Sequence, residues 1–119
     1  MFTTDYGRLV QNLTKPGKEI LESLTPEQTN VWHMATGVST EAGELLDAVK
    51  KYAVYQKEID RENVIEELGD LEFYMEGIRQ ALDIERDDVL LHNYNKLNKR
   101  YHQGKYSDQQ AQERKDKDG

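Results

Sequence analysis

The chain has 119 residues, a formal net charge of −7 and no cysteine. This charge disfavours binding to DNA or RNA, because their phosphates would be repelled, and the lack of cysteine excludes disulfides and thiolate metal sites. The sequence shows no apolar run long enough to span a membrane and no pattern of an export signal at its start. We therefore expect a cytoplasmic protein that binds neither nucleic acid nor membranes.

Short helices are expected near the N-terminus. A first helix is predicted at about residues 6–13, and a further turn or short helix at 18–24. Thr25 and Pro26 then form a strong helix start, with threonine as N-cap and proline at the first helical position. Gln28, three residues after the cap, completes a capping box.

Two long helices follow that start. Apolar residues recur at steps of three and four to about Tyr55, and the pattern repeats over 61–82. The loop near 57–60 is short, so these helices should be antiparallel neighbours. A final helix is predicted at 87–101.

Few apolar residues follow that last helix, so we expect 107–119 to be a polar, solvated tail after a single domain at 1–106. The predicted fold class is all-α, an antiparallel bundle of about four to five helices. The core of a chain of this size is thin, and oligomerisation is expected to complete it.

Paired acids mark the two long helices. Glu41 and Glu44 stand three residues apart on one helix, and Glu67 and Asp70 on the next, so each pair shares a helix face beside the apolar stripe. Four inward carboxylates repel one another unless cations neutralise them. A glycine separates each pair, Gly43 and Gly69, and because glycine is unfavourable within a helix, we expect close helix approach at these positions.

Oxygen ligands without sulfur or imidazole favour Mg²⁺, with Mn²⁺ as a substitute. One alternative is a di-iron carboxylate bundle, but its Glu-x-x-His pattern is absent, because no histidine of this chain follows a glutamate by three. A second alternative is a non-catalytic helical interaction protein whose acids decorate a solvated surface. A single Glu-x-x-Glu would favour that alternative, whereas the paired motif argues against it.

These segments resemble the MazG-like all-α NTP pyrophosphohydrolases, whose signature is Glu-x-x-Glu and then Glu-x-x-Asp on two antiparallel helices. The likeness extends over residues 24–107 and includes the sequences EAGELLD, EELGDL, KLNKRY and GKYS. It implies Mg²⁺-dependent hydrolysis of a (deoxy)nucleoside triphosphate to the monophosphate and pyrophosphate, in nucleotide-pool house-cleaning, by a dimer or tetramer. The implied metal ligands are Glu41, Glu44, Glu67 and Asp70, and Glu44 is favoured as the general base.

Candidate substrate contacts lie on both sides of the acids. The resemblance places Asn93, Lys96 and Arg100 among the substrate and triphosphate contacts, and Lys105 belongs to the same basic cluster. It also places Tyr74 beside the sugar, four residues after Asp70, although a packed core tyrosine explains that position nearly as well. Trp32 and His33 could contact the base, but the pattern favours a core or subunit anchor for Trp32, and a structural role for His33 is at least equally compatible with it. The residues leave open the preferred base and which phosphorus is attacked.

Overall fold

The computed structural model describes residues 1–117 and contains only helices and connecting segments in that range. This confirms the all-α fold class. None of the helices within that range combines the length and apolarity that a membrane crossing requires. The helices are α1 (Phe2–Leu13), α2 (Gly17–Ser23), α3 (Pro26–Ala53), α4 (Arg61–Leu82), α5 (Arg86–Arg100), α6 (Asp108–Glu113) and the 3-10 turn η1 (Lys115–Lys117).

Capping residues decide where the helices begin. The predicted capping box is present, because the Gln28 backbone N–H donates to the Thr25 hydroxyl at 3.2 Å and the Thr25 N–H donates to the Gln28 side chain at 2.9 Å. The Asp60 side chain accepts from the Asn63 N–H at 3.1 Å, which starts α4 at its predicted residue. By contrast α1 begins earlier than predicted, at Phe2, where no side-chain cap marks the start.

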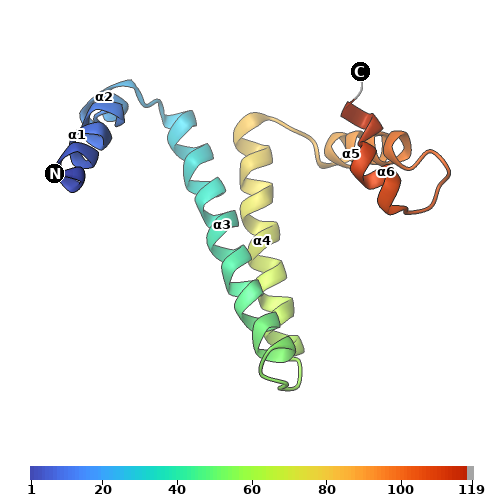
Figure 1. Cartoon of the computed structure of the whole chain (residues 1–119). Helices are drawn as coiled ribbons and strands as arrows, with labels where there is room; N and C mark the ends of the chain where they lie inside the picture. Colours follow the sequence, from blue (N-terminus) through green and yellow to red (C-terminus); the bar gives the residue numbers. More distant parts are fainter. Residues whose placement is uncertain (118–119) are drawn as a thin grey trace.

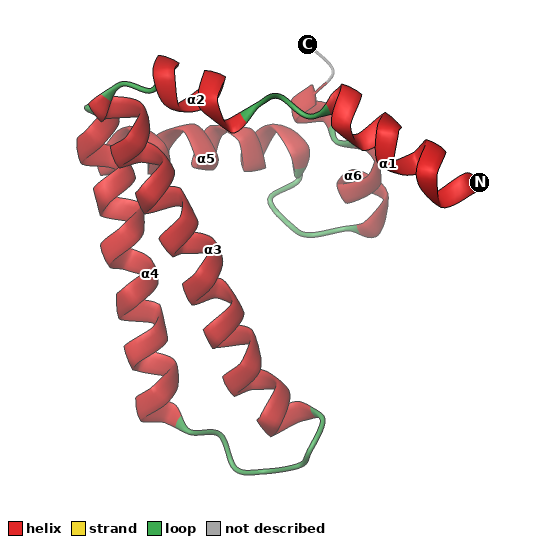
Figure 2. Cartoon of the chain, turned by 90° about the vertical axis from the view of Figure 1, so that its left-hand side faces the viewer, coloured by secondary structure: helices red, strands yellow, loops and turns green. Residues whose placement is uncertain are grey.

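The centre of the fold is the hairpin of α3 and α4. The two helices run side by side and antiparallel, joined by a short loop at one end (Figures 1 and 2). The packed positions of α3 and α4 recur every three or four residues, as expected for helices that bury one stripe each. The prediction of two antiparallel neighbours is therefore confirmed.

Close approach of the two helices occurs at glycines other than the expected pair. A Cβ at Gly37 would lie 2.2 Å from the Tyr74 ring, and a Cβ at Gly77 would lie 2.3 Å from the Met34 sulfur. A Cβ at Gly43 or Gly69 would meet nothing within 4 Å. The expectation of close approach at these two glycines is therefore wrong for this chain. The reason is angular: a residue two positions after an inward acid lies about 200° around the helix, on the outer side.

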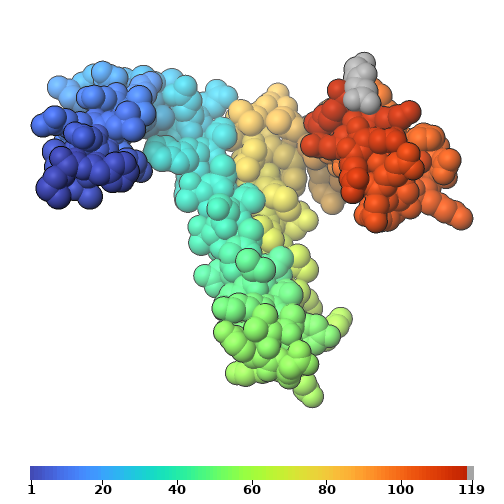
Figure 3. Space-filling view, in the orientation of Figure 1, coloured from blue at the N-terminus to red at the C-terminus, as the bar shows by residue number. Residues whose placement is uncertain are grey.

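The hairpin carries two lateral arms at its open end. Helices α1 and α2 extend to one side and α5 and α6 to the other, so the space-filling view shows three separate lobes (Figure 3). The radius of gyration is 20.4 Å, against about 13 Å for a compact chain of roughly this length. Ala48 is the sole buried hydrophobic side chain in the described range. One copy of the chain therefore leaves most of its apolar surface uncovered.

The uncovered surface is organised into stripes rather than scattered. On α1 one stripe repeats at three- and four-residue steps, and none of its members is buried. Its residues are Phe2, Tyr6, Leu9, Val10 and Leu13. No other element within residues 1–117 packs extensively against this helix. Contiguous apolar faces of this kind mark interaction surfaces.

The C-terminal segment, predicted to be a polar tail, contains α6 and η1 in the described range. Ser107 caps α6 by accepting from the Gln110 N–H at 3.1 Å, and the chain then turns back against α5. The Arg100 guanidinium donates two hydrogen bonds to the Asp116 carboxylate, at 2.8 and 3.2 Å. The Asp116 side chain is 2% exposed. A buried, two-pronged ion pair thus orders a segment that has few apolar residues. Residues 118–119 of the predicted tail lie outside the described range.

Gly37→Ala should destabilise the protein, because the added methyl group would overlap the Tyr74 ring close to its attachment point. Overpacking of this kind costs about 1–3 kcal/mol, so thermal unfolding followed by circular dichroism should show a lower midpoint. Gly43→Ala is the matched control in the same helix: its methyl enters open space, and it should raise stability by up to about 1 kcal/mol. Equal midpoints for the two variants would contradict the close approach.

Asp116→Ala should release α6 and η1 from α5, since it leaves the Arg100 guanidinium without its partner. Limited proteolysis should then cleave the segment after Ser107 faster than in the unmodified chain. Glu113→Gln is the control, because this side chain pairs only with Gln109 on the exposed side of α6. Cleavage at the same rate in all three proteins would contradict the anchoring role of the pair.

Candidate metal and substrate site

Three carboxylates converge between α3 and α4. Glu41, Glu67 and Asp70 each offer one oxygen, and these oxygens lie within 4.8 Å of one another. Glu67 and Asp70 share the face of α4 that packs on α3, and Glu41 comes from the facing side of α3. All three side chains are half-buried. Three of the four acids that were expected to face inward therefore do so, whereas Glu44 is exposed.

Glu67 is the member of this cluster whose pKa is raised by its neighbours. Its Oε2 atom is shielded from solvent and has no hydrogen-bond partner. A hydrogen bond to Glu41, partial desolvation and the charges of Glu41, Asp70 and Glu44 together raise the pKa of Glu67 from 4.5 to about 7. Near neutral pH and without a cation, a proton is therefore held on Glu67 and shared with Glu41 through their hydrogen bond.

Glu44 lies at the edge of the cluster. Its side chain is exposed and it does not belong to the group of three, but its charge contributes to raising the pKa of Glu67. It stands one helical turn after Glu41 on neighbouring sides of α3. This position, close to the cluster and open to solvent, is compatible with contact to both a cation and a water molecule.

The three inner residues fit a hard divalent cation. Carboxylate oxygens are the ligands that Mg²⁺ and Mn²⁺ prefer, and a cation would replace the shared proton and satisfy the shielded oxygen of Glu67. No histidine within residues 1–117 belongs to the group, which argues against the di-iron alternative. Acids that merely decorate a surface would stay apart and solvated, so the convergence also argues against the interaction-protein alternative.

One aromatic candidate, Tyr74, lies one helical turn from the carboxylates, and a second, His33, contacts it. The Tyr74 ring, one turn after Asp70, packs over Gly37, one turn before Glu41. His33 meets the same ring edge-on with centroids 6.4 Å apart. Trp32 is 60% exposed. It lies on the side of α3 opposite Glu41, because the nine-residue step between these positions corresponds to about two and a half turns.

The basic candidates lie on the arm formed by α5 and α6, away from the carboxylates of the same chain. Both ribbon views show α5 leaving the open end of the hairpin (Figures 1 and 2). Lys96 lines a hollow on this arm with Lys99, and Arg100 is engaged with Asp116. Asn93 on the same helix is exposed, and Lys105 follows the helix in the loop before α6. One chain thus brings together the acids, His33 and Tyr74, but not these four residues.

Sequence reasoning missed the residues that set the spacing of the hairpin. Gly37 precedes Glu41 by four and Gly77 follows Tyr74 by three, so both lie on the inward stripe. The signal was available, because a glycine in phase with inward residues permits close approach whereas one out of phase does not. The pairing of Arg100 with Asp116 had no local signal, since the partners lie 16 residues apart.

Comparison with known proteins gives one family. The description "MazG nucleotide pyrophosphohydrolase domain" matches residues 30–104, which include all four acidic positions and α5. No curated protein and no solved structure gives a significant match to the chain.

The raised pKa of Glu67 predicts how stability should depend on pH without added metal. Because the folded state holds the Glu67 proton more tightly than the unfolded state, stability should be greatest below about pH 4.5 for this group and fall as pH rises to about 7. Mg²⁺ should therefore raise the unfolding midpoint more at pH 8 than at pH 5, as scanning calorimetry can measure. Glu67→Gln should remove this pH dependence, and an unchanged profile in that variant would contradict the assignment.

Proposed function

The chain belongs to the MazG nucleotide pyrophosphohydrolase family, and from this premise we propose that it hydrolyses nucleoside triphosphates, deoxynucleotides above all, to the monophosphate and pyrophosphate. The observation that carries the proposal is the convergence of Glu41, Glu67 and Asp70 within 4.8 Å. A triphosphate chain carries several negative charges, so an acidic site can accept it only when cations lie between the phosphates and the carboxylates.

The proposed metal ligands are Glu41, Glu44, Glu67 and Asp70, with Mg²⁺ as the cation and Mn²⁺ as a substitute. When bound, Mg²⁺ would neutralise phosphate charge and acidify the attacking water. The shielded oxygen of Glu67 and its raised pKa support this ligand set, because a cation satisfies the oxygen and displaces the proton.

Glu44 is proposed as the general base. It is the most solvent-open acid of the four, and a base must reach a water molecule on the substrate side of the cluster. Its carboxylate takes the proton from the water that attacks phosphorus, so no covalent enzyme intermediate is needed. Cleavage of the anhydride bridge between the α and β phosphorus atoms gives the monophosphate and pyrophosphate.

Tyr74 and His33 are proposed to line the nucleoside side of the site. The contact of their rings holds both beside the carboxylates, on the side that leads to the open end of the hairpin. Trp32 is proposed to contact the base from another copy of the chain, since it faces away from the cluster of its own chain.

Assembly of copies is part of the proposal. The unpartnered stripe of α1 and the exposed faces of α3 and α4 support a dimer or a dimer-paired tetramer. In such an assembly Asn93, Lys96, Arg100 and Lys105 are proposed to contact the triphosphate at the site of another copy. The Arg100 guanidinium would then act while still bonded to Asp116. We place this activity in cytoplasmic nucleotide-pool house-cleaning.

Glu67→Gln, Asp70→Asn and Glu44→Gln should each lower Mg²⁺-dependent pyrophosphate release by about a hundredfold or more. The assay incubates the protein with a panel of nucleoside triphosphates and separates the products by anion exchange. Reaction in ¹⁸O-water then identifies the phosphorus that is attacked, because the label enters the monophosphate after attack on the α phosphorus and the pyrophosphate after attack on the β phosphorus.

Glu72→Gln is the matched control, because this exposed acid lies on the outer side of α4. It should retain full activity. Activity that survives in Glu67→Gln and Asp70→Asn, or products consisting of diphosphate and inorganic phosphate, would refute the proposed reaction.

A further inference from the structure

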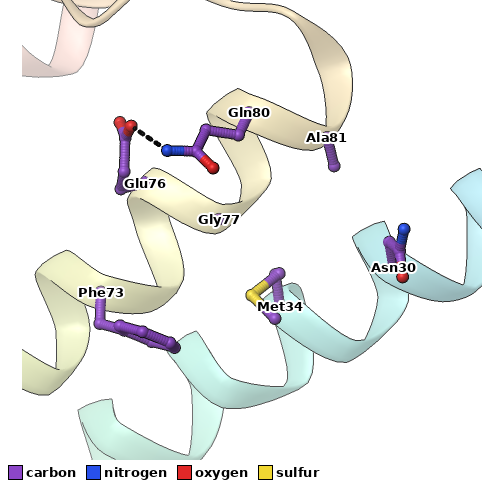
Figure 4. A pocket seen from close by; sticks show the side chains of 7 residues that line it. All are labelled: Asn30, Met34, Phe73, Glu76, Gly77, Gln80 and Ala81. Carbon is purple, nitrogen blue, oxygen red and sulfur yellow. Dashed lines mark hydrogen bonds between the residues drawn. The ribbon is translucent and has the colours of Figure 1, made fainter.

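A groove between α3 and α4 lies at the open end of the hairpin (Figure 4). Its volume is about 570 Å³, within the range of small-molecule sites. Phe73 and Met34 supply apolar surface, and the Met34 side chain lies over Gly77 at the floor. Asn30, Glu76 and Gln80 supply the polar groups at its edge. The groove thus combines a flat apolar wall with a few hydrogen-bonding groups.

This groove continues the carboxylate cluster along the hairpin. Tyr74 links the two, since its ring packs over Gly37 and meets the Phe73 ring edge-on with centroids 5.1 Å apart. From Asp70 to Gln80 the helix rises about 15 Å. Both side chains lean toward the N-terminus of the same helix, so this separation is kept. It is comparable to the length of a nucleoside monophosphate that is joined to the acids through a bound cation.

Gln80 is held in one orientation. Its Nε2 donates to Glu76 Oε2 at 3.0 Å, while Arg79 donates to Glu76 Oε1 at 2.9 Å. These hydrogen bonds lower the pKa of Glu76, which stays ionised and can only accept. The amide must therefore turn its NH₂ group to Glu76, which leaves its carbonyl oxygen as an acceptor on the side of Gly77 (Figure 4).

The geometry points to this groove as the base pocket of the proposed hydrolase, in which Phe73 stacks on the base and the Gln80 carbonyl selects a base that carries an exocyclic amino group. This inference rests on the proposed function for the position of the phosphates. An amino group donates to the Gln80 oxygen, whereas the carbonyl of uracil or thymine would place two acceptors against each other. Stacking on Phe73 is independent of base identity.

The cleanest test compares deoxycytidine with deoxyuridine nucleotides, which differ at the 4-position by an amino group against a carbonyl. The wild-type protein should favour dCTP over dUTP in kcat/KM by about tenfold, the value of one satisfied hydrogen bond against an unpaired acceptor. Gln80→Leu should bring this ratio close to one. Phe73→Ala should raise KM for both nucleotides alike and leave their ratio unchanged.

Gln109→Leu is the matched control, because it removes the same kind of Gln–Glu pair from α6. It should retain the wild-type ratio. A Gln80→Leu variant that keeps the wild-type ratio would overturn the assignment, as would a Gln80→Leu variant that changes only the oligomeric state in ultracentrifugation. In the latter case an apolar segment of another copy covers the groove.

Calorimetric binding of dCMP and dUMP separates this inference from the proposed reaction. A preference for dCMP that Gln80→Leu abolishes supports the pocket whether or not triphosphates are cleaved. Equal binding of dCMP and dUMP by the wild-type protein overturns the pocket, while cleavage of both triphosphates leaves the proposed reaction intact.

Discussion

The close contact of α3 with α4 is the interaction on which the rest of the structure depends. At Gly37 the helix offers no side chain, and the Tyr74 ring fills that space. At Gly77 the Met34 side chain does the same in the opposite direction. These two reciprocal fits set the spacing at which Glu41 can reach Glu67 and Asp70. A wider spacing would separate the acids and remove both the shared proton and the cation site.

The same contact explains why the carboxylate cluster is energetically unfavourable without a cation. Carboxylates held together repel one another, and the protein tolerates them by keeping a proton on Glu67. A divalent cation would remove the need for that proton and would bring positive charge to a chain whose net charge is −7. It would thus reverse, at one place, the sign of the charge that the whole sequence presents to a phosphate.

Local signals predicted much of this arrangement. The start of α3 could be predicted from Thr25 and Gln28, because a capping box is a contact between residues three apart. Each pair of acids could be assigned to one helix face for the same reason, since its members also lie three residues apart. Local sequence patterns did not predict contacts between residues that are far apart in the chain. Gly43 lies beside the acids but is out of phase with the inward stripe, so it does not permit close helix approach. Gly37 is in phase with that stripe and does permit it. The helical structure of the C-terminal segment has no apolar pattern that could predict it, because its order comes from the pairing of Asp116 with Arg100.

The hairpin has a kinetic consequence. Its two helices are consecutive in the chain and separated by a short loop, so their pairing requires little loop-closure entropy and belongs to the class of local contacts that form fast. The acids therefore meet by a first-order process within a single polypeptide. Association with another copy, which would cover the apolar stripe of α1, is a second-order process. Its rate falls as the protein concentration falls. A newly made chain would hold its carboxylate cluster before it encountered a second one, and capture of a cation could precede association.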